Sequence, residues 1–307
     1  MTLGDPRGIG PEVMPLAVEA FLREAPESPV LLLGPSGSDP GLGPYESVGE
    51  WDGSQRGAGH LTGEAIRRGV ELSRTGSVGA LVTGPAHKPA LREAGWEVPG
   101  QTEILQQMVG ADTVGMLMCA ASTFLGSPFR VLLATTHLPL REIFRHLTPE
   151  LLWAQGSLLA KSFREDWGIT NPRLAFCAVN PHAGDQGLFG TEEESLFLPA
   201  LARLKESGVD ASGPLSADTV FRRAMEGEFD AVVAPYHDVG MAAFKSVSFG
   251  TGVNVTIGLP LIRTSPDHGT AFDIVGTGRA DPRSAEEALR LASFLMANRF
   301  SHQGGPL

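Results

Sequence analysis

Three histidines, each placed just after an apolar run, are the residues with the clearest chemistry in this sequence of 307 residues. They are His137, His182 and His237, in the segments Thr-His-Leu-Pro, Asn-Pro-His-Ala-Gly and Tyr-His-Asp. Neutral imidazole is the commonest protein ligand of zinc and related ions, and three protein ligands with one open position are typical of catalytic sites. A single loop histidine is usually structural, but three at equivalent strand ends favour a divalent-metal site in an enzyme.

The elements that must position these histidines are short apolar runs that alternate with helical patterns, which is typical of the α/β class with parallel strands. Because the runs are almost continuously apolar, we expect strands covered on both faces. The predicted strands are Val30–Gly34, Ala80–Thr83, Val114–Cys119, Arg130–Thr135, Leu174–Val179, Ala231–Ala234 and Val253–Ile257. The predicted helices are Pro11–Glu24, Gly63–Arg74, Thr102–Val109, Pro149–Asp166, Thr191–Ser207, Ala217–Met225 and Ser284–Ala297. The segment Gly37–Gly63, rich in Gly, Pro and Ser, predicts an irregular surface connection.

Composition narrows the class of protein. With 42% hydrophobic residues, the chain can bury the core of one large α/β unit or of two lobes. Acidic residues outnumber basic ones by 35 to 24 and no basic cluster is present, which argues against a nucleic-acid partner. No apolar stretch reaches membrane-spanning length. Cys119 and Cys177 both lie in apolar runs, as buried reduced thiols do, so we expect a soluble cytoplasmic protein.

Basic and polar residues near these loops indicate what the metal would face. Lys245 follows His237 along the chain, and Arg263 follows the strand that contains Asn254. These three could converge on an anionic group of a substrate, although isolated Lys and Arg side chains are usually only solvated. Lys88 is a further candidate of the same kind. The glycine-rich segment Gly4–Glu12 opens a helix and either faces an anion or forms a tight turn, and its spacing differs from a dinucleotide fingerprint.

Taken in order, these segments resemble one family closely, the 4-hydroxythreonine-4-phosphate dehydrogenases of the pyridoxal phosphate pathway and their relatives that act on four-carbon sugar-acid phosphates. The resembling segments are Gly4–Glu12, Thr83–Lys88, Thr135–Leu140, Asn180–Glu193, Gly213–Thr219, Tyr236–Asp238 and Leu259–Gly269. The resemblance implies an isocitrate dehydrogenase-like fold, with two α/β lobes around a cleft, in a homodimer. Its expected lobes are 1–102 with 246–307, and an inserted lobe 103–245 that carries the histidine loops.

The resemblance also implies roles for individual residues. His137, His182 and His237 would hold a divalent ion (zinc, magnesium or cobalt) in a site built from both subunits. The residues implied to bind a phosphorylated substrate are Gln101, Thr102, Lys245, Asn254 and Arg263.

Three features depart from the family pattern. Gln101 stands where the family has a histidine, which replaces a group that can carry charge by a neutral amide and leaves the substrate open. Val239 stands where a glutamine is expected after Tyr-His-Asp. Only three residues precede Gly4, so the first strand is short and we expect the sequence to start late.

The activity that the resemblance implies is metal-dependent oxidation of a secondary alcohol by NAD or NADP, followed by decarboxylation of the resulting β-keto acid. Lys245, Asp238 and a metal-bound water are alternative general bases, and no residue is assigned to the nicotinamide cofactor. Alternative substrates are erythronate or threonate 4-phosphate and a cis-dihydrodiol dicarboxylate. A metallohydrolase and a non-catalytic sensor are alternatives from other classes, and the retention of all three histidines argues against the sensor.

Overall fold

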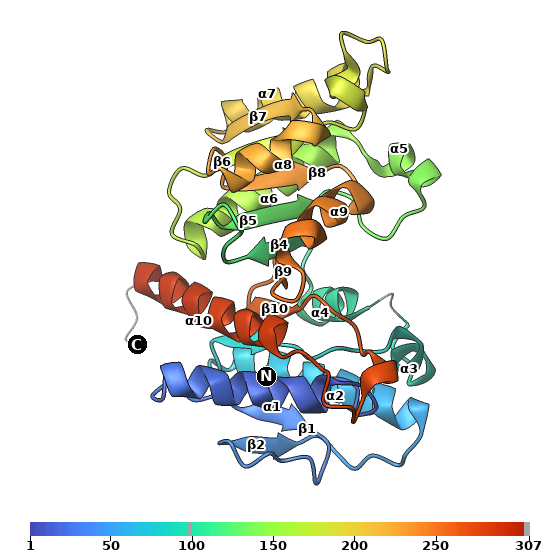
Figure 1. The fold of residues 1–307 in the computed structure, drawn as a ribbon, viewed down its shortest axis with the longest axis vertical. Coiled ribbons are helices and arrows are strands. Elements are labelled where there is room, and N and C mark those ends of the chain that lie inside the picture. The colour runs from blue at the N-terminus through green and yellow to red at the C-terminus, as the bar shows by residue number, and fades with distance from the viewer. Residues whose placement is uncertain (98–99, 304–307) are drawn as a thin grey trace. The chain divides into compact units, whose positions relative to one another are not determined.

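The computed structural model describes residues 1–97 and 100–303, which divide into two compact units (Figure 1). Unit 1 comprises Met1–Asp112 and Gly250–Met296, and unit 2 comprises the segment inserted between them, Thr113–Phe249, with the C-terminal residues from Ala297. Within the described residues, no helix has both the length and the apolar character that a membrane span needs.

Unit 1 contains two groups of strands. β1 (Leu32–Gly34) and β2 (Tyr45–Ser47) form a parallel pair. In the second group, β10 (Ile262–Pro266) is parallel to β3 (Ala80–Val82) on one side and antiparallel to β9 (Val253–Ile257) on the other. The helical segments of this unit are α1 (Gly10–Glu24), α2 (Gln55–Arg74), α3 (Lys88–Glu93), α4 (Gln101–Val109), η4 (Phe272–Ile274) and most of α10 (Arg283–Gln303).

Unit 2 contains a mainly parallel sheet whose strands lie in the order β4–β5–β8–β6–β7. These strands are β4 (Gly115–Ala120), β5 (Phe129–Leu133), β6 (Arg173–Cys177), β7 (Asp210–Leu215) and β8 (Ala231–Ala234). Only β4 runs antiparallel to its described neighbour, β5. The helical segments are η1 (Leu140–Glu142), α5 (Ile143–His146), α6 (Pro149–Glu165), η2 (Pro181–Gly184), η3 (Glu193–Phe197), α7 (Leu198–Glu206), α8 (Ala217–Met225) and α9 (His237–Ser248).

Aromatic side chains build part of the core of unit 2 on one face of this sheet. Phe129 of β5 stacks on Phe244 of α9 with ring centroids 6.0 Å apart, and it meets Phe221 of α8 edge-on at 6.3 Å. Val131 and Val232, on the neighbouring strands β5 and β8, are completely buried. Close packing of this kind fixes the strands and therefore the points at which the loops after them begin.

The predicted α/β class is confirmed, and each predicted strand overlaps a strand of the structure. Strands β2, β7 and β10 and helices α3, α5 and α9 were not predicted. The prediction of an irregular connection over Gly37–Gly63 is wrong in part, because it contains β2 and the start of α2. Ser54 caps α2 by accepting the Gly57 N–H at 2.8 Å. At Gly59 a Cβ atom would collide with the Ala90 carbonyl oxygen, so this glycine allows close helix packing and does not mark a loop.

The boundaries of the two units can be set beside the expected lobes. Helix α4, most of which was expected in the inserted lobe 103–245, lies in unit 1. Helix α9 lies wholly in unit 2, although its last residues were expected in the first lobe.

Candidate active site

The three predicted metal ligands follow three adjacent parallel strands of unit 2. His137 comes after β5, His237 after β8 and His182 after β6, and β8 lies between the other two strands. The predicted placement at the carboxyl ends of strands is therefore confirmed. That edge of an open parallel sheet is where ligands bind in α/β proteins.

The structure brings His137 and His237 together. Their ring centroids are 5.5 Å apart, and both line a pocket of about 140 Å³ that Tyr236 also borders. His237 Nδ1 lies 2.8 Å from a carboxylate oxygen of Asp238. A carboxylate on one ring nitrogen orients the imidazole and leaves Nε2 as the ligating atom, which is the usual arrangement around metal-binding histidines.

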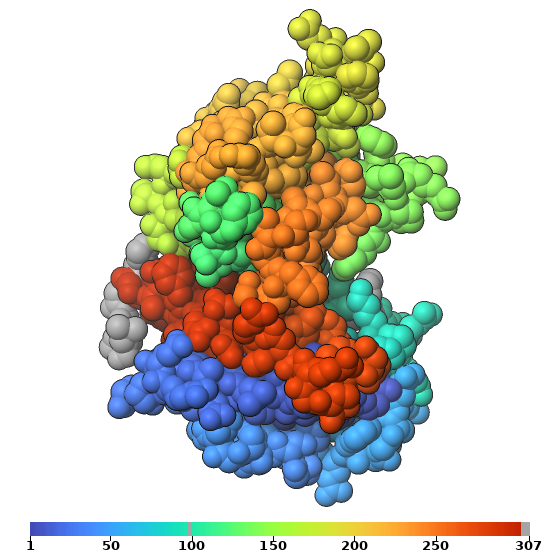
Figure 2. All heavy atoms as spheres, viewed as in Figure 1, coloured from blue at the N-terminus to red at the C-terminus, as the bar shows by residue number. Residues whose placement is uncertain are grey.

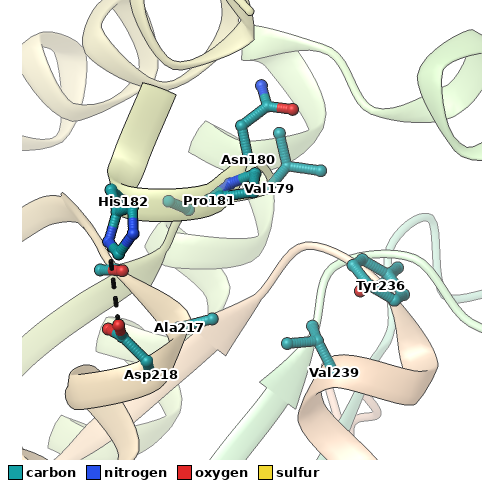
Figure 3. A pocket seen from close by; sticks show the side chains of 10 residues that line it. Val179, Asn180, Pro181, His182, Ala217, Asp218, Tyr236 and Val239 are labelled. Atoms are coloured by element: carbon teal, nitrogen blue, oxygen red, sulfur yellow. Dashed lines mark ion pairs between the residues drawn. The ribbon is translucent and has the colours of Figure 1, made fainter. Parts of the chain in front are cut away.

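His182 lines a different pocket in the same unit, of about 290 Å³ (Figure 3). Its Nδ1 lies 3.9 Å from Oδ2 of Asp218, which belongs to the first turn of α8. Tyr236 borders this pocket as well as the first, and burial raises the pKa of its hydroxyl above the ordinary value. Within residues 1–97 and 100–303, no group of three His, Cys, Asp or Glu side chains is placed to hold one ion. Within one chain, then, two of the three predicted ligands meet and the third lies apart.

The loop that carries His182 has an unusual backbone. His182, Ala183, Asp185 and Gln186 all have positive φ angles, between 42° and 56°. A residue with a Cβ atom loses roughly 1–2 kcal/mol in this left-handed region, so such a run is found where the surroundings impose it. The buried carboxylate of Glu193 accepts hydrogen bonds from the backbone N–H groups of the residues just before the loop.

Arg263 is the most deeply buried of the predicted substrate-binding residues, with 3% of its surface exposed. Its guanidinium donates to Thr83 Oγ1 at 2.7 and 3.1 Å, to Thr256 Oγ1 at 2.9 Å and to Gln101 Oε1 at 3.3 Å. All these acceptors are neutral, and among the described residues no carboxylate hydrogen-bonds to it. Burial lowers the pKa of Arg263 to about 10, against the weaker attraction of Glu103. It is therefore a buried cation at neutral pH.

The other predicted substrate-binding residues lie on helix α4, strand β9 and helix α9. Gln101 and Thr102 form the first turn of α4, and Gln101 Nε2 donates to the Gly84 carbonyl at 2.9 Å. Asn254, on β9, has a buried Oδ1 that accepts no hydrogen bond within the described part of the chain. Lys245 lies in the last turn of α9 in unit 2.

The sequence did not single out several residues that shape these sites. Thr83 and Thr256 orient Arg263, Asp218 faces His182, and Glu193 anchors the His182 loop. The predicted strand Ala80–Thr83 does end on Thr83, so its position was a usable signal. The roles of Thr256, Asp218 and Glu193 are apparent only in the folded structure, from the contacts that these residues make there.

The glycine-rich segment Gly4–Glu12 forms a tight entry into α1 that is held by internal contacts of unit 1. Arg7 bonds to the buried Asp5 at 2.8 Å and to His87 Nδ1 at 3.1 Å, and its guanidinium lies 5.2 Å from the Phe272 ring centroid. The Arg7 side chain and His87 therefore have local partners within unit 1.

The fold and the site together define a class of protein, an α/β enzyme-like chain with its predicted metal-ligating histidines after strand ends. An isocitrate dehydrogenase of Methylococcus capsulatus has the same fold with a TM-score of 0.52, over 99% of this chain and 84% of that one. Its sequence identity of 14% supports the fold alone. The predicted isocitrate dehydrogenase-like fold is confirmed.

The family is shown by more similar proteins. Residues 41–292 match the family model described as pyridoxal phosphate biosynthetic protein PdxA. A 4-hydroxythreonine-4-phosphate dehydrogenase of Paracoccus denitrificans is 38% identical over 319 residues, covering 97% of this chain and 98% of its own. The crystal structure of an enzyme of that name from Klebsiella pneumoniae has a TM-score of 0.82 and 34% identity, over 96% of this chain and 98% of its own. The chain belongs to the PdxA family, and the predicted resemblance is confirmed.

Proposed function

We propose that this protein is a dehydrogenase that oxidises the secondary alcohol of 4-hydroxythreonine 4-phosphate with NAD or NADP and releases carbon dioxide from the resulting β-keto acid. The names of its relatives support the reaction class. The observation that carries the substrate class is Arg263, a buried cation with only neutral hydrogen-bond partners in the described structure.

The phosphate assignment follows from the energetics of that cation. A buried charge whose hydrogen-bond partners are all neutral is unfavourable, and an anionic ligand would relieve the cost. Guanidinium groups suit phosphate because their planar N–H donors match its oxygens. The N–H groups at the start of α4 and the side chain of Asn254 are further polar groups of unit 1 that we assign to this substrate, and Lys245 stays a predicted contact.

The histidine pair fits a divalent metal ion as a partial set of ligands. Imidazole rings with centroids 5.5 Å apart can approach one ion, and the Asp238 contact gives His237 the orientation that a ligand needs. When bound, such an ion supplies a Lewis acid that stabilises negative charge on the reacting oxygen, and NAD accepts the hydride. We assign Asp238 to holding the proton at His237 Nδ1 instead of to base catalysis, because its carboxylate is engaged there.

We further propose that the complete metal site forms in a homodimer, in which His182 of one copy completes the pair His137 and His237 of the other. Support comes from the lack of a three-ligand group within the described part of one chain. Exposed apolar side chains also flank both sets of histidines: Leu138, Leu140, Phe144, Leu188 and Phe189. The segment 181–192 projects from unit 2 in Figure 2, and helix α5 projects from the same unit in Figure 1.

The thiols of Cys119 and Cys177 are free and buried, which fits the predicted cytoplasmic location.

The activity is tested by following reduced-nicotinamide absorbance with 4-hydroxythreonine 4-phosphate, with erythronate and threonate 4-phosphates, and with a cis-dihydrodiol dicarboxylate. Each is measured with and without a chelator. We expect a chelator-sensitive signal that is largest with 4-hydroxythreonine 4-phosphate. A larger signal with an aldonate phosphate would reassign the substrate, and no signal with any compound would overturn the proposal.

The shared site is tested by mixing two inactive variants, His182→Ala and His137→Ala, after mild dissociation. In a mixed dimer with shared sites, one site carries both substitutions and the other carries neither. Random mixing should therefore restore about a quarter of the wild-type activity. If each chain carried its own complete site, no activity would return.

A further inference from the structure

We propose that Glu193 is the positioning residue for His182, because its carboxylate holds the loop of this ligand in the conformation that metal binding requires. The inference rests on the proposed metal-binding function and extends it to a residue of unit 2 that does not itself bind the metal.

The first argument is the set of contacts that Glu193 makes. The side chain is buried, with 4% of the residue exposed. One carboxylate oxygen accepts the backbone N–H groups of Val179 and Asn180 at 3.0 and 2.8 Å, and the other accepts the Asn180 side-chain amide at 2.9 Å. These two residues join the end of β6 to Pro181 and His182. The carboxylate therefore fixes the chain at the point where the ligand loop begins.

The second argument is the conformation of the loop itself. His182, Ala183, Asp185 and Gln186 are all left-handed, which an isolated chain of residues with Cβ atoms does not prefer. The loop also folds onto the same carboxylate, because a Cβ atom at Gly184 would stand 3.0 Å from Glu193 Oε2. Contacts before and inside the loop thus converge on one side chain, which imposes the strained conformation.

The third argument is the element that carries Glu193. Residues Glu193–Phe197 form a π-helical turn, a feature that is rare and frequently found at functional sites. Phe197, at the end of this turn, is completely buried and ties it to the core of unit 2. Glu193 therefore connects the loop of His182 to a turn that is anchored in the core of unit 2.

The consequence is a dependence of metal affinity on Glu193. If the loop samples other conformations, the apparent dissociation constant rises by the inverse of the fraction that is competent to bind. Residues that orient metal ligands commonly contribute 10- to 100-fold to metal affinity.

The experiment compares metal binding by Glu193→Gln and Glu193→Ala with that of the wild type. The glutamine keeps one acceptor oxygen for the two backbone N–H groups but places an amide NH₂ against the Asn180 amide. We expect Co²⁺ and Zn²⁺ affinities, measured by competition with a chelating dye, to fall about tenfold for glutamine and about a hundredfold for alanine. The absorption spectrum of bound Co²⁺ should change as well. Glu194→Gln, on the exposed neighbouring residue, is the matched control and should bind like the wild type.

A second measurement does not depend on metal. Hydrogen exchange of the metal-free proteins should be faster over residues 178–190 in Glu193→Ala than in the wild type and Glu194→Gln. Wild-type metal affinity and an unchanged Co²⁺ spectrum in folded Glu193→Ala would overturn the inference, as would unchanged exchange in this segment. A wild-type protein that binds no metal would instead overturn the proposed function, while the exchange measurement would still decide whether Glu193 holds the loop.

Discussion

Arg263 in unit 1 and His182 in unit 2 are both predicted binding residues, and the structure holds them in different ways. Arg263 is almost wholly buried and its side chain is fixed by threonine hydroxyls and the Gln101 amide. The His182 side chain is 68% exposed, and it is the backbone beneath it that is fixed, through Glu193. Arg263 is therefore preorganised by contacts within its own unit, whereas the His182 side chain faces solvent.

Because their environments differ, the two residues should respond differently to their ligands. A buried cation raises the free energy of the folded protein until an anion arrives, so ligand binding and stability should be coupled at Arg263. An exposed histidine contributes little to stability, so its loss should affect binding and turnover only.

The largest expected effect is that of His182→Ala. Loss of a metal ligand should remove bound metal and lower kcat by roughly 1,000-fold or more, because a metal ion supplies several kcal/mol of transition-state stabilisation. The melting temperature of the metal-free protein should stay unchanged, since the side chain is exposed. Elemental analysis, turnover and thermal melts measure the three quantities. Metal retained at full stoichiometry would contradict the assignment of His182.

Arg263→Met should affect substrate binding and the coupling of that binding to stability. Substrate affinity should fall by about a hundredfold or more, because the variant leaves a bound anion without its buried charge partner. The melting temperature of the ligand-free variant should be equal to or above that of the wild type, since a desolvated charge is removed. Inorganic phosphate should raise the melting temperature of the wild type and not that of the variant.

Arg68→Met is the control for that experiment. Arg68 lies on α2 in the same unit but pairs with Glu46 at the surface, at 2.6 Å. Partly exposed ion pairs of this kind contribute about 1 kcal/mol, so this variant should keep its response to phosphate and melt close to the wild type. An equal loss of the phosphate response in both variants would show that Arg263 is not the anion site.

A smaller effect is expected at Gln101. Gln101→His removes the arrangement in which Oε1 accepts from Arg263 while Nε2 donates to the Gly84 carbonyl. An imidazole titrates near pH 6.5, so KM should acquire a pH dependence between about pH 5 and 8 that the wild type lacks at this position. We expect a change of about tenfold or less in KM, with kcat nearly unchanged. A pH profile identical to that of the wild type would exclude contact between residue 101 and the substrate phosphate.

The sequence predicted those parts of the molecule that depend on local patterns. Continuous apolar runs such as Ala231–Ala234 marked buried strands, and the residue just after each run marked the histidine positions. Strand β10 was missed because it is Ile-Arg-Thr-Ser-Pro, in which a buried arginine and two hydroxyls interrupt the apolar pattern. Two of these polar residues have partners distant in the sequence: Arg263 donates across the sheet to Thr83, and Thr264 Oγ1 donates to the Ala288 carbonyl of α10. Sequence alone does not show such partners.

The separation of His182 from the other two histidines within one chain does not follow from the strand pattern, which places the three residues at equivalent positions after adjacent strands. Only the resemblance to the family implied a metal site built from both subunits. The left-handed run after Pro181 directs the loop differently, toward Asp218, and it depends on Glu193, which lies 11 positions further along the sequence than His182. Long-range anchoring of this kind leaves no periodic signal.

The smallest effect concerns the two cysteines of unit 2, which report on the sheet beneath the histidine loops. Burial raises the pKa of Cys119 and of Cys177 to about 12, so at pH 8 both thiols are protonated and inaccessible. Native wild type should therefore react with a disulfide reagent only as fast as it unfolds. Cys177 ends β6, a few residues before His182, so His182→Ala should be equally unreactive if its defect is confined to the ligand. Rapid modification of Cys177 in that variant would mean that the strand end has opened, and the loss of metal would then reflect a structural change in unit 2 instead of the loss of one imidazole.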